Sequence, residues 1–328
     1  MEKKLILRGI LAGAVAGLLA FVFARIFAEP QIAKAIDYES GRDAAQSALD
    51  KAAGLPAEAA DPDLFSRTIQ ANVGIGVGMV FFGMAMGALF AVAYTVCLGR
   101  TGGLRARNLA LLVAGGGFLG MYLVPFLKYP ANPPAIGHEE TIKQRSALYL
   151  IMVVCSVALL AGAVYLGKYL QKRYGNWNAT LLAGAAFVVA IGIVMLLLPQ
   201  LGHLSYNKAN FGNQATETPL PLKDSKGNIV YPGFPADVLF TFRFYSVAAQ
   251  LILWTALGLI FAPSPSASST PRGRTRTPPH RSPIPSRRDE LPSTAGAVID
   301  EITAPGPFSR EGLGSWVGRA RTRAGIRR

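Results

Sequence analysis

The sequence predicts an all-α, polytopic transmembrane helix bundle of about six helices, with both termini cytoplasmic and a disordered C-terminal tail. Three observations lead to this fold class. Hydrophobic residues make up 51% of the chain and charged residues only 16%, compared with about 25% charged residues in an average soluble domain. Several apolar stretches reach the roughly 20 residues that a helix needs to cross a bilayer. Basic residues also concentrate in alternate connections between these stretches.

The apolar stretches place six helices in a membrane domain of residues 1–262. The first is expected to be a retained helix rather than a cleaved signal peptide, because Arg25 falls where a cleavage site requires small neutral residues. The connection after this helix has a helical pattern, and the Pro-, Asn- and Gly-rich fifth connection predicts turns and a short hairpin. The expected helices cover residues 5–27, 74–98, 109–127, 146–166, 180–198 and 236–262.

The distribution of charge among the connections predicts the orientation. Residues 28–73 contain eight acidic and four basic residues. By contrast, the second and fourth connections contain basic residues and no acidic ones. Because cytoplasmic loops of membrane proteins are enriched in Lys and Arg, these two connections and both termini are expected inside. The basic residues are Arg100, Arg105, Arg107, Lys168, Lys172 and Arg173.

About half of the net charge of +14 lies near the C-terminus, and much of the rest lies in short connections between the apolar stretches rather than on a binding face. Residues 264–328 hold 12 Arg and five acidic residues in a Pro- and Ser-rich composition. Such a segment cannot bury an apolar core, so residues 263–328 are expected to be a disordered basic tail. A tail of this kind beside a membrane helix is also suited to anionic lipid. The lipid bilayer is therefore an expected partner, and nucleic acid is not.

The sequence contains none of the common catalytic motifs. It lacks a phosphate-binding loop, the nucleophile pattern Gly-x-Ser-x-Gly, the zinc pattern His-Glu-x-x-His and a Cys-x-x-Cys pair. The two cysteines, Cys97 and Cys155, lie in apolar stretches and are expected to act as small buried residues. The chain is therefore expected not to be an enzyme, and to hold no permanently bound cofactor.

Glycines recur at intervals that favour close helix packing. Gly13 and Gly17 in the first helix, and Gly83 and Gly87 in the second, each have the small-x-x-x-small spacing. This spacing lets the backbones of membrane helices approach one another. These positions are expected at helix interfaces.

The sixth helix carries polar residues on one face. Arg243, Ser246 and Gln250 recur at steps of three and four residues, and Gln250 falls near the middle of the span. Polar groups at that depth are costly in lipid, so this face is expected to point inward. Two interpretations remain open, namely a hydrogen bond between helices and the lining of a path for a solute.

Histidine and carboxylate residues in the connections give candidate metal ligands. His138 lies beside Glu139 and Glu140, and His203 follows the fifth helix. Imidazole with carboxylate suits Co(II), Ni(II) or Zn(II), although ordinary solvated residues would show the same pattern. Two arginines near helix ends, Arg25 and Arg243, each have an acidic residue nearby and are expected to form local ion pairs with Glu29 and Asp237, respectively.

Several longer stretches resemble one protein family. They are residues 23–30 (FARIFAEP), 36–43 (IDYESGRD), 128–137 (KYPANPPAIG) and 234–246 (FPADVLFTFRFYS). Together they resemble the CbtA family of probable cobalt transporter subunits over about residues 1–262. The resemblance implies a protein of the bacterial cytoplasmic membrane that takes up cobalt for cobalamin synthesis with a small CbtB-type subunit. The family is usually described with five membrane helices, one fewer than the number expected here.

The stretches that carry the resemblance lie at helix ends on the side predicted to face outward. The expected mechanism collects Co(II) at an outer vestibule and passes it along the polar face of the sixth helix, with energy from a partner or an ion gradient. The alternative is an accessory or assembly subunit of a metal-handling complex that transports nothing itself. The expected metal ligands are Glu29, Asp37, Glu39, His138, His203 and Asp237, and the expected path-lining residues are Arg243, Ser246 and Gln250.

Overall fold

The computed structural model describes residues 2–56, 65–100, 103–134, 136–212, 214 and 216–262, which form one unit. The predicted disordered tail, residues 263–328, lies outside the described residues.

Long apolar helices make up most of the described chain, which confirms the predicted class of helical, multi-pass membrane protein. Five continuous helical segments are long and apolar enough to cross a membrane. The third is interrupted by a π-helical turn, η2, an arrangement that often marks a functional position in an α-helix. The segments contain α1 (Glu2–Phe27), α4 (Ile75–Cys97), α5 (Ala106–Gly117) with η2 (Phe118–Leu123) and α6 (Val124–Lys128), α7 (Ile142–Leu197), and α9 (Ala236–Phe261).

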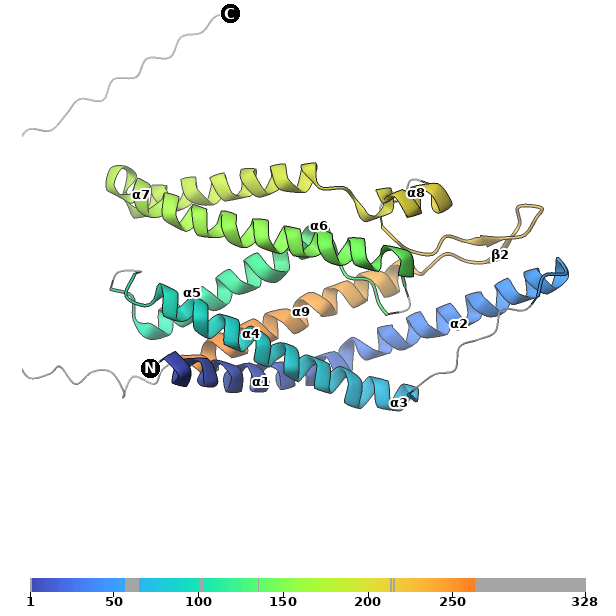
Figure 1. The fold of residues 1–328 in the computed structure, drawn as a ribbon, viewed down its shortest axis with the longest axis horizontal. Helices are drawn as coiled ribbons and strands as arrows, with labels where there is room; N and C mark the ends of the chain where they lie inside the picture. The colour runs from blue at the N-terminus through green and yellow to red at the C-terminus, as the bar shows by residue number, and fades with distance from the viewer. Residues whose placement is uncertain are drawn as a thin grey trace, which may run out of the picture. The chain divides into compact units, whose positions relative to one another are not determined.

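The longest segment, α7, accounts for two of the expected membrane passes. It is assigned as one helix of 56 residues, but Gly175 has φ 71° and ψ 172°, which is not helical. Only glycine adopts such a backbone readily. Figure 1 shows the two arms of α7 running back alongside each other from this point. The fourth connection was expected to be a loop, whereas it is helical on both sides of a single reversing residue.

The beginning of α1 and the end of α9 lie at the same end of the helices. The Arg8 guanidinium donates a hydrogen bond to the Ala262 carbonyl over 3.0 Å. This placement agrees with an even number of passes, since the chain leaves the bundle where it entered. The cytoplasmic side of this end remains a prediction from the loop charges.

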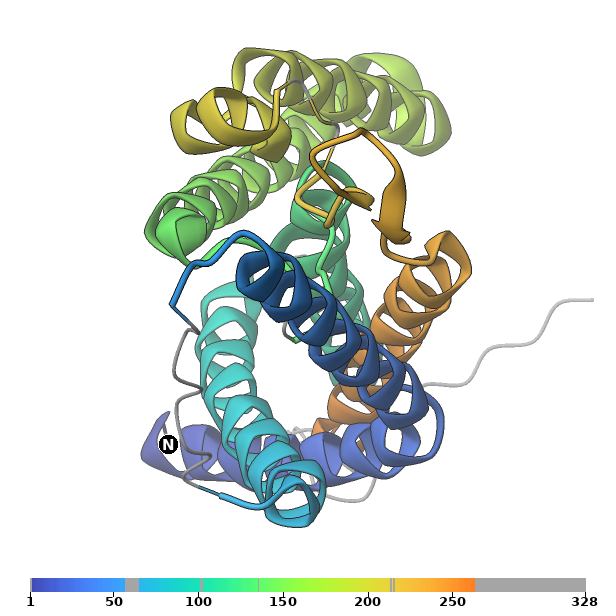
Figure 2. The ribbon, with the colours of Figure 1, turned by 90° about the vertical axis from the view of Figure 1, so that its right-hand side faces the viewer.

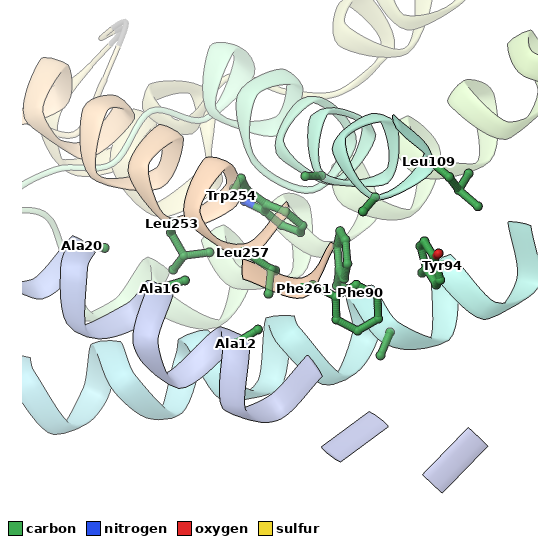
Figure 3. Packing of buried hydrophobic residues seen from close by; sticks show 13 residues of the cluster. Ala12, Ala16, Ala20, Phe90, Tyr94, Leu109, Leu253, Trp254, Leu257 and Phe261 are labelled. Atoms are coloured by element: carbon green, nitrogen blue, oxygen red, sulfur yellow. The ribbon is translucent and has the colours of Figure 1, made fainter. Parts of the chain in front are cut away.

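One buried hydrophobic core of the unit lies between α1, α4, α5 and α9 (Figure 3). Its buried residues combine small side chains of α1, such as Ala16, with large ones of α9, such as Trp254 and Phe261. The predicted close approach of glycines is present: a Cβ atom added to Gly13 would lie 2.1 Å from the carbonyl oxygen of Gly83. Side chains at these positions would therefore separate α1 from α4.

The long connections gather at the other end of the helices, in a region that we call the loop cap (Figures 1 and 2). The loop cap consists of α2 and of residues 129–141 and 198–235. The expected hairpin is present as two antiparallel strands. The elements at this end are α2 (Glu29–Ala52), α3 (Arg67–Ile69), η1 (Gln70–Gly74), η3 (Glu139–Thr141), η4 (Leu201–His203), α8 (Ser205–Phe211), β1 (Leu222–Lys223) and β2 (Ile229–Tyr231).

Candidate functional site

Aromatic packing fixes α2 to the β hairpin. The ring of Tyr38 lies 5.3 Å from that of Tyr231 and 5.1 Å from that of Phe234, measured between centroids. A Cβ atom added to Gly41 would lie 2.2 Å from the Tyr231 hydroxyl. Glycine at position 41 therefore allows Tyr231 to approach the α2 backbone, and this contact sets the position of the carboxylates on the same helix.

The start of α9 is held by two loops through Arg243. Its guanidinium donates to the Ala131 carbonyl (3.1 Å), to Oδ1 of Asn132 (2.8 Å) and to Oγ1 of Thr216 (3.2 Å). The Asn132 amide in turn donates to the Glu217 carbonyl over 2.8 Å. Arg243 was expected to pair with Asp237, whereas among the described residues it joins residues 131–132 to residues 216–217. Its place on a path for a solute stays a prediction.

A buried ion pair lies behind this junction. Only 1% of the Glu217 side chain is exposed, and its Oε2 lies 3.2 Å from Nε of Arg145. The N–H of Arg145 does not point at the carboxylate, so neither atom has a hydrogen-bond partner among the described residues. The other carboxylate oxygen accepts a hydrogen bond from the Asn207 amide. A buried carboxylate therefore meets a partly exposed guanidinium, and the hydrogen bonding between them is incomplete.

A polar pocket of about 380 Å³ opens beside this pair. Its lining includes Glu39 from α2, His138 and Glu139 from the segment before α7, and Arg145. Burial, together with the charges of Asp43 and Glu139, raises the pKa of Glu39 above its ordinary value. A carboxylate in this state experiences negative potential, which a bound cation would relieve.

His138 is positioned and neutralised by its surroundings. Its ring stacks on Phe211 with centroids 4.2 Å apart and an angle of 7° between the planes. Burial lowers the pKa of His138, and the charges of Glu217 and Glu140 oppose this effect. Because a metal binds neutral imidazole, the lowered pKa keeps His138 in the form that can act as a ligand near neutral pH.

A second, mostly apolar pocket of about 440 Å³ adjoins the first. Both are lined by Asn132, Ile142 and Arg145. The second pocket continues along the first arm of α7, where Ser146 and Tyr149 line it. The side chain of Arg145 thus lies between the two pockets and lines both of them.

The loop cap brings together two of the six predicted metal ligands, Glu39 and His138, which line the polar pocket. Within the described ranges, no three His, Cys, Asp or Glu residues are close enough to form a metal site. Any cation in the pocket would therefore need water, amide or backbone oxygens to complete its coordination.

The other four predicted ligands lie elsewhere. Glu29 is 7% exposed and pairs with Arg67, while Arg25 donates to the Asn72 side chain over 2.8 Å. The expected pair between Arg25 and Glu29 is thus replaced by contacts of both residues with the segment that leads into α4. The remaining three, Asp37, His203 and Asp237, are exposed.

The predicted polar face of α9 has only local hydrogen bonds beyond Arg243. Ser246 donates to the Phe242 carbonyl of the same helix over 2.8 Å. Gln250 is partly buried, and its side chain makes no hydrogen bond to the residues that the structure describes. One turn further, Trp254 packs so closely on α5 that a Cβ atom at Gly117 would lie 2.2 Å from its ring. Of the two interpretations of Gln250, the interhelical hydrogen bond is not formed in this conformation.

Sequence reasoning missed Arg145, Asn207 and Glu217 as members of the site. All three lie outside the expected helices, and no local pattern distinguishes them from solvated residues of a connection. The signal that identifies them is spatial, because Arg145 at the start of α7 meets Asn207 and Glu217 of the later connection only in the folded chain. A buried carboxylate with one charged neighbour is visible only in the folded chain.

The fold defines a multi-pass membrane protein, with a pocket lined by carboxylate and imidazole side chains at one end of its helices. Comparison with protein families gives the particular class. The family model described as "Probable cobalt transporter subunit (CbtA)" matches residues 2–264. The chain therefore belongs to the CbtA family, as the resemblance implied. No curated protein and no solved structure matches it.

Proposed function

We propose that the chain is the membrane subunit of a transporter that takes up Co(II), with the polar pocket of the loop cap as the point of entry. The observation that supports this proposal most directly is the joint lining of that pocket by Glu39, His138 and Glu139. Carboxylate oxygen and neutral imidazole nitrogen are ligands that suit a borderline divalent cation. Among the described residues these ligands are not close enough together to form a tight metal site. Weak binding suits a transporter, because a transported ion must also be released.

The onward route runs through the adjoining apolar pocket and then between the helices. The shared wall at Asn132 and Arg145 connects the two pockets. Further along this route we place Gln250, which is partly buried within the span of α9. Its side-chain amide makes no hydrogen bond to the described residues and is therefore available to the ion. Because the sequence has no nucleotide-binding loop, the energy comes from an ion gradient or from a partner.

The link to cobalamin synthesis and the small CbtB-type partner are part of this proposal and are supported by the family resemblance alone. A non-transporting accessory subunit is the second candidate. The observation that favours this second candidate is the mostly exposed apolar surface of the second α7 arm. Such a surface can pack against a helix of another membrane protein as well as against lipid.

The experiment is cobalt accumulation in cells that lack their own uptake system and express this chain with its presumed partner. Glu39→Gln keeps the side-chain shape and removes the charge, so we expect it to reduce accumulation at low external cobalt by about tenfold or more. Asp37→Asn is the matched control, because it removes the same charge from the same helix at an exposed position outside the pocket.

Both variants should reach the membrane in wild-type amounts, as measured by immunoblotting of membrane fractions. Equal accumulation by wild type, Glu39→Gln and Asp37→Asn would contradict the assignment of the pocket as the entry site. Absence of cobalt accumulation by the wild type itself would favour the accessory function.

A further inference from the structure

The pair formed by Arg145 and Glu217 is a costly feature that the capture of a cation in the polar pocket does not require. The carboxylate is almost fully buried, and one of its oxygens lacks a hydrogen bond within the described part of the chain. Removing two charges from water costs several kcal/mol per ion unless geometry and hydrogen bonding are excellent. Here Nε of Arg145 and Oε2 of Glu217 are only 3.2 Å apart but are not aligned for a hydrogen bond. The ion pair therefore offsets only part of the cost of removing the charges from water.

The surroundings of the pair supply further oxygen atoms. Asn207 is 2% exposed, and its Oδ1 also lacks a partner among the described residues. Its amide nitrogen donates both to Glu217 and, over 2.7 Å, to the Leu201 carbonyl. Glu217 Oε2 and Asn207 Oδ1 are thus two buried oxygen atoms without hydrogen bonds in the described residues, on side chains that a hydrogen bond joins. Carboxylate and amide oxygens are ligands that hard and borderline cations use.

Arg145 separates these oxygen atoms from the two pockets. It lines both of them, whereas Glu217 lines neither. Room for its guanidinium depends on Gly137, which has φ +132° and where an added Cβ atom would lie 2.6 Å from Nη1 of Arg145. The Arg145 side chain remains 25% exposed, so it can leave the carboxylate toward the pocket without crossing the core.

We propose that Glu217 is an internal cation-binding carboxylate, which Arg145 neutralises while the site is empty. A divalent cation that enters through the polar pocket replaces Arg145 as the counter-charge of Glu217, and the displaced guanidinium moves toward Glu39 and Glu139. The site then binds the cation through Glu217 and Asn207. The exchange keeps the buried carboxylate paired at every stage and couples binding to a movement of Arg145. This inference deepens the proposed function and rests on it.

The test uses the full-length chain in detergent, with Co(II) as the probe and calorimetry and thermal unfolding as the measurements. Arg145→Gln removes the competing charge, so we expect Co(II) to bind about tenfold more tightly than to wild type and to raise the unfolding temperature more than it does in wild type. Glu217→Gln should bind Co(II) more weakly than wild type by a similar factor. The double variant should resemble Glu217→Gln.

The double variant also separates this proposal from a purely structural ion pair. Arg145→Gln leaves the buried Glu217 carboxylate without its counter-charge, whereas the double substitution removes that carboxylate charge as well. The stability of the double variant without metal should therefore exceed that of Arg145→Gln. A structural pair would show this recovery with identical Co(II) affinity in all four proteins, and that result would overturn the proposal. If Arg145→Gln unfolds without metal, recovery of its fold by Co(II) but not by Mg(II) would support it, and no recovery would overturn it.

Failure of the internal site at Glu217 can be distinguished from failure of the proposed transport function. If wild type neither binds nor transports Co(II), the function itself is wrong. If wild type binds and transports Co(II), and Glu217→Gln does both equally well, only the internal site is wrong.

Discussion

Replacing Gly83 by alanine adds one methyl group at the closest contact between α1 and α4. The added Cβ atom would lie 2.3 Å from the Gly13 carbonyl oxygen and 2.9 Å from Cα of Gly17, whereas ordinary contacts begin at 3.4 Å. The helices must therefore separate locally by about 1 Å. Overpacking of this kind costs about 1–3 kcal/mol. The neighbours are backbone atoms, so rotation of a side chain cannot relieve the contact.

The matched control is Gly78→Ala on the same helix, where an added Cβ atom meets nothing within 4 Å. Alanine is favoured over glycine inside a helix at both positions, so this contribution cancels when the two variants are compared. The difference between them should be the overpacking cost alone, with Gly83→Ala less stable by about 1–3 kcal/mol.

The assay is unfolding of the purified proteins in mixed micelles with increasing denaturing detergent, followed by circular dichroism. The variant Gly13→Ala should behave like Gly83→Ala, because its Cβ atom would lie 2.1 Å from the Gly83 carbonyl oxygen. The double variant should cost less than the sum of the two, since both methyl groups press on one interface. Equal stability of Gly83→Ala and Gly78→Ala would refute the close packing of α1 on α4.

Three further predictions concern orientation, path and pH. Cysteine at Ser40 should react with an impermeant thiol reagent in intact cells and cysteine at Gly103 only after lysis, and labelling of Gly103 from outside would reverse the predicted orientation. Gln250→Leu should abolish cobalt uptake without changing stability, whereas a loss of about 1 kcal/mol with normal uptake would indicate a bond between helices. Because the pKa of Glu39 is raised, protons should compete with Co(II) at a higher pH than for an ordinary carboxylate. As the pH falls, Co(II) binding to wild type should therefore begin to weaken at a higher pH than an ordinary carboxylate ligand would give, and this early loss should be smaller in Glu39→Gln.

The spans could be predicted from the sequence because their apolar composition is a local property. The reversal in α7 was harder to place. Residues 167–179 carry charges and polar groups, as a loop would, yet both sides of Gly175 continue as helix. Glycine spacing likewise predicted close packing without indicating the partners, because the register of Gly13 on Gly83 depends on how two separate helices pack.

The candidate site could be predicted only in part. His138 was predicted from ligand chemistry and Glu39 from its place in a stretch that carries the family resemblance, and both line one pocket. Asp37 and Asp237 have the same chemistry but are exposed, and residue type alone cannot distinguish the two cases. Glu217 lies in a Pro-, Asn- and Gly-rich connection where a solvated charge is expected, although tertiary packing buries it almost completely.

The most direct test of the central claim is Co(II) entry into lipid vesicles that contain only this purified chain. A cobalt-sensitive dye inside the vesicles would report entry down an imposed Co(II) gradient. The account predicts faster entry than into empty vesicles, a marked loss with Glu39→Gln, and little change with Asp37→Asn. Entry no faster than into empty vesicles, by a protein shown to be folded and inserted, would contradict transport by this chain.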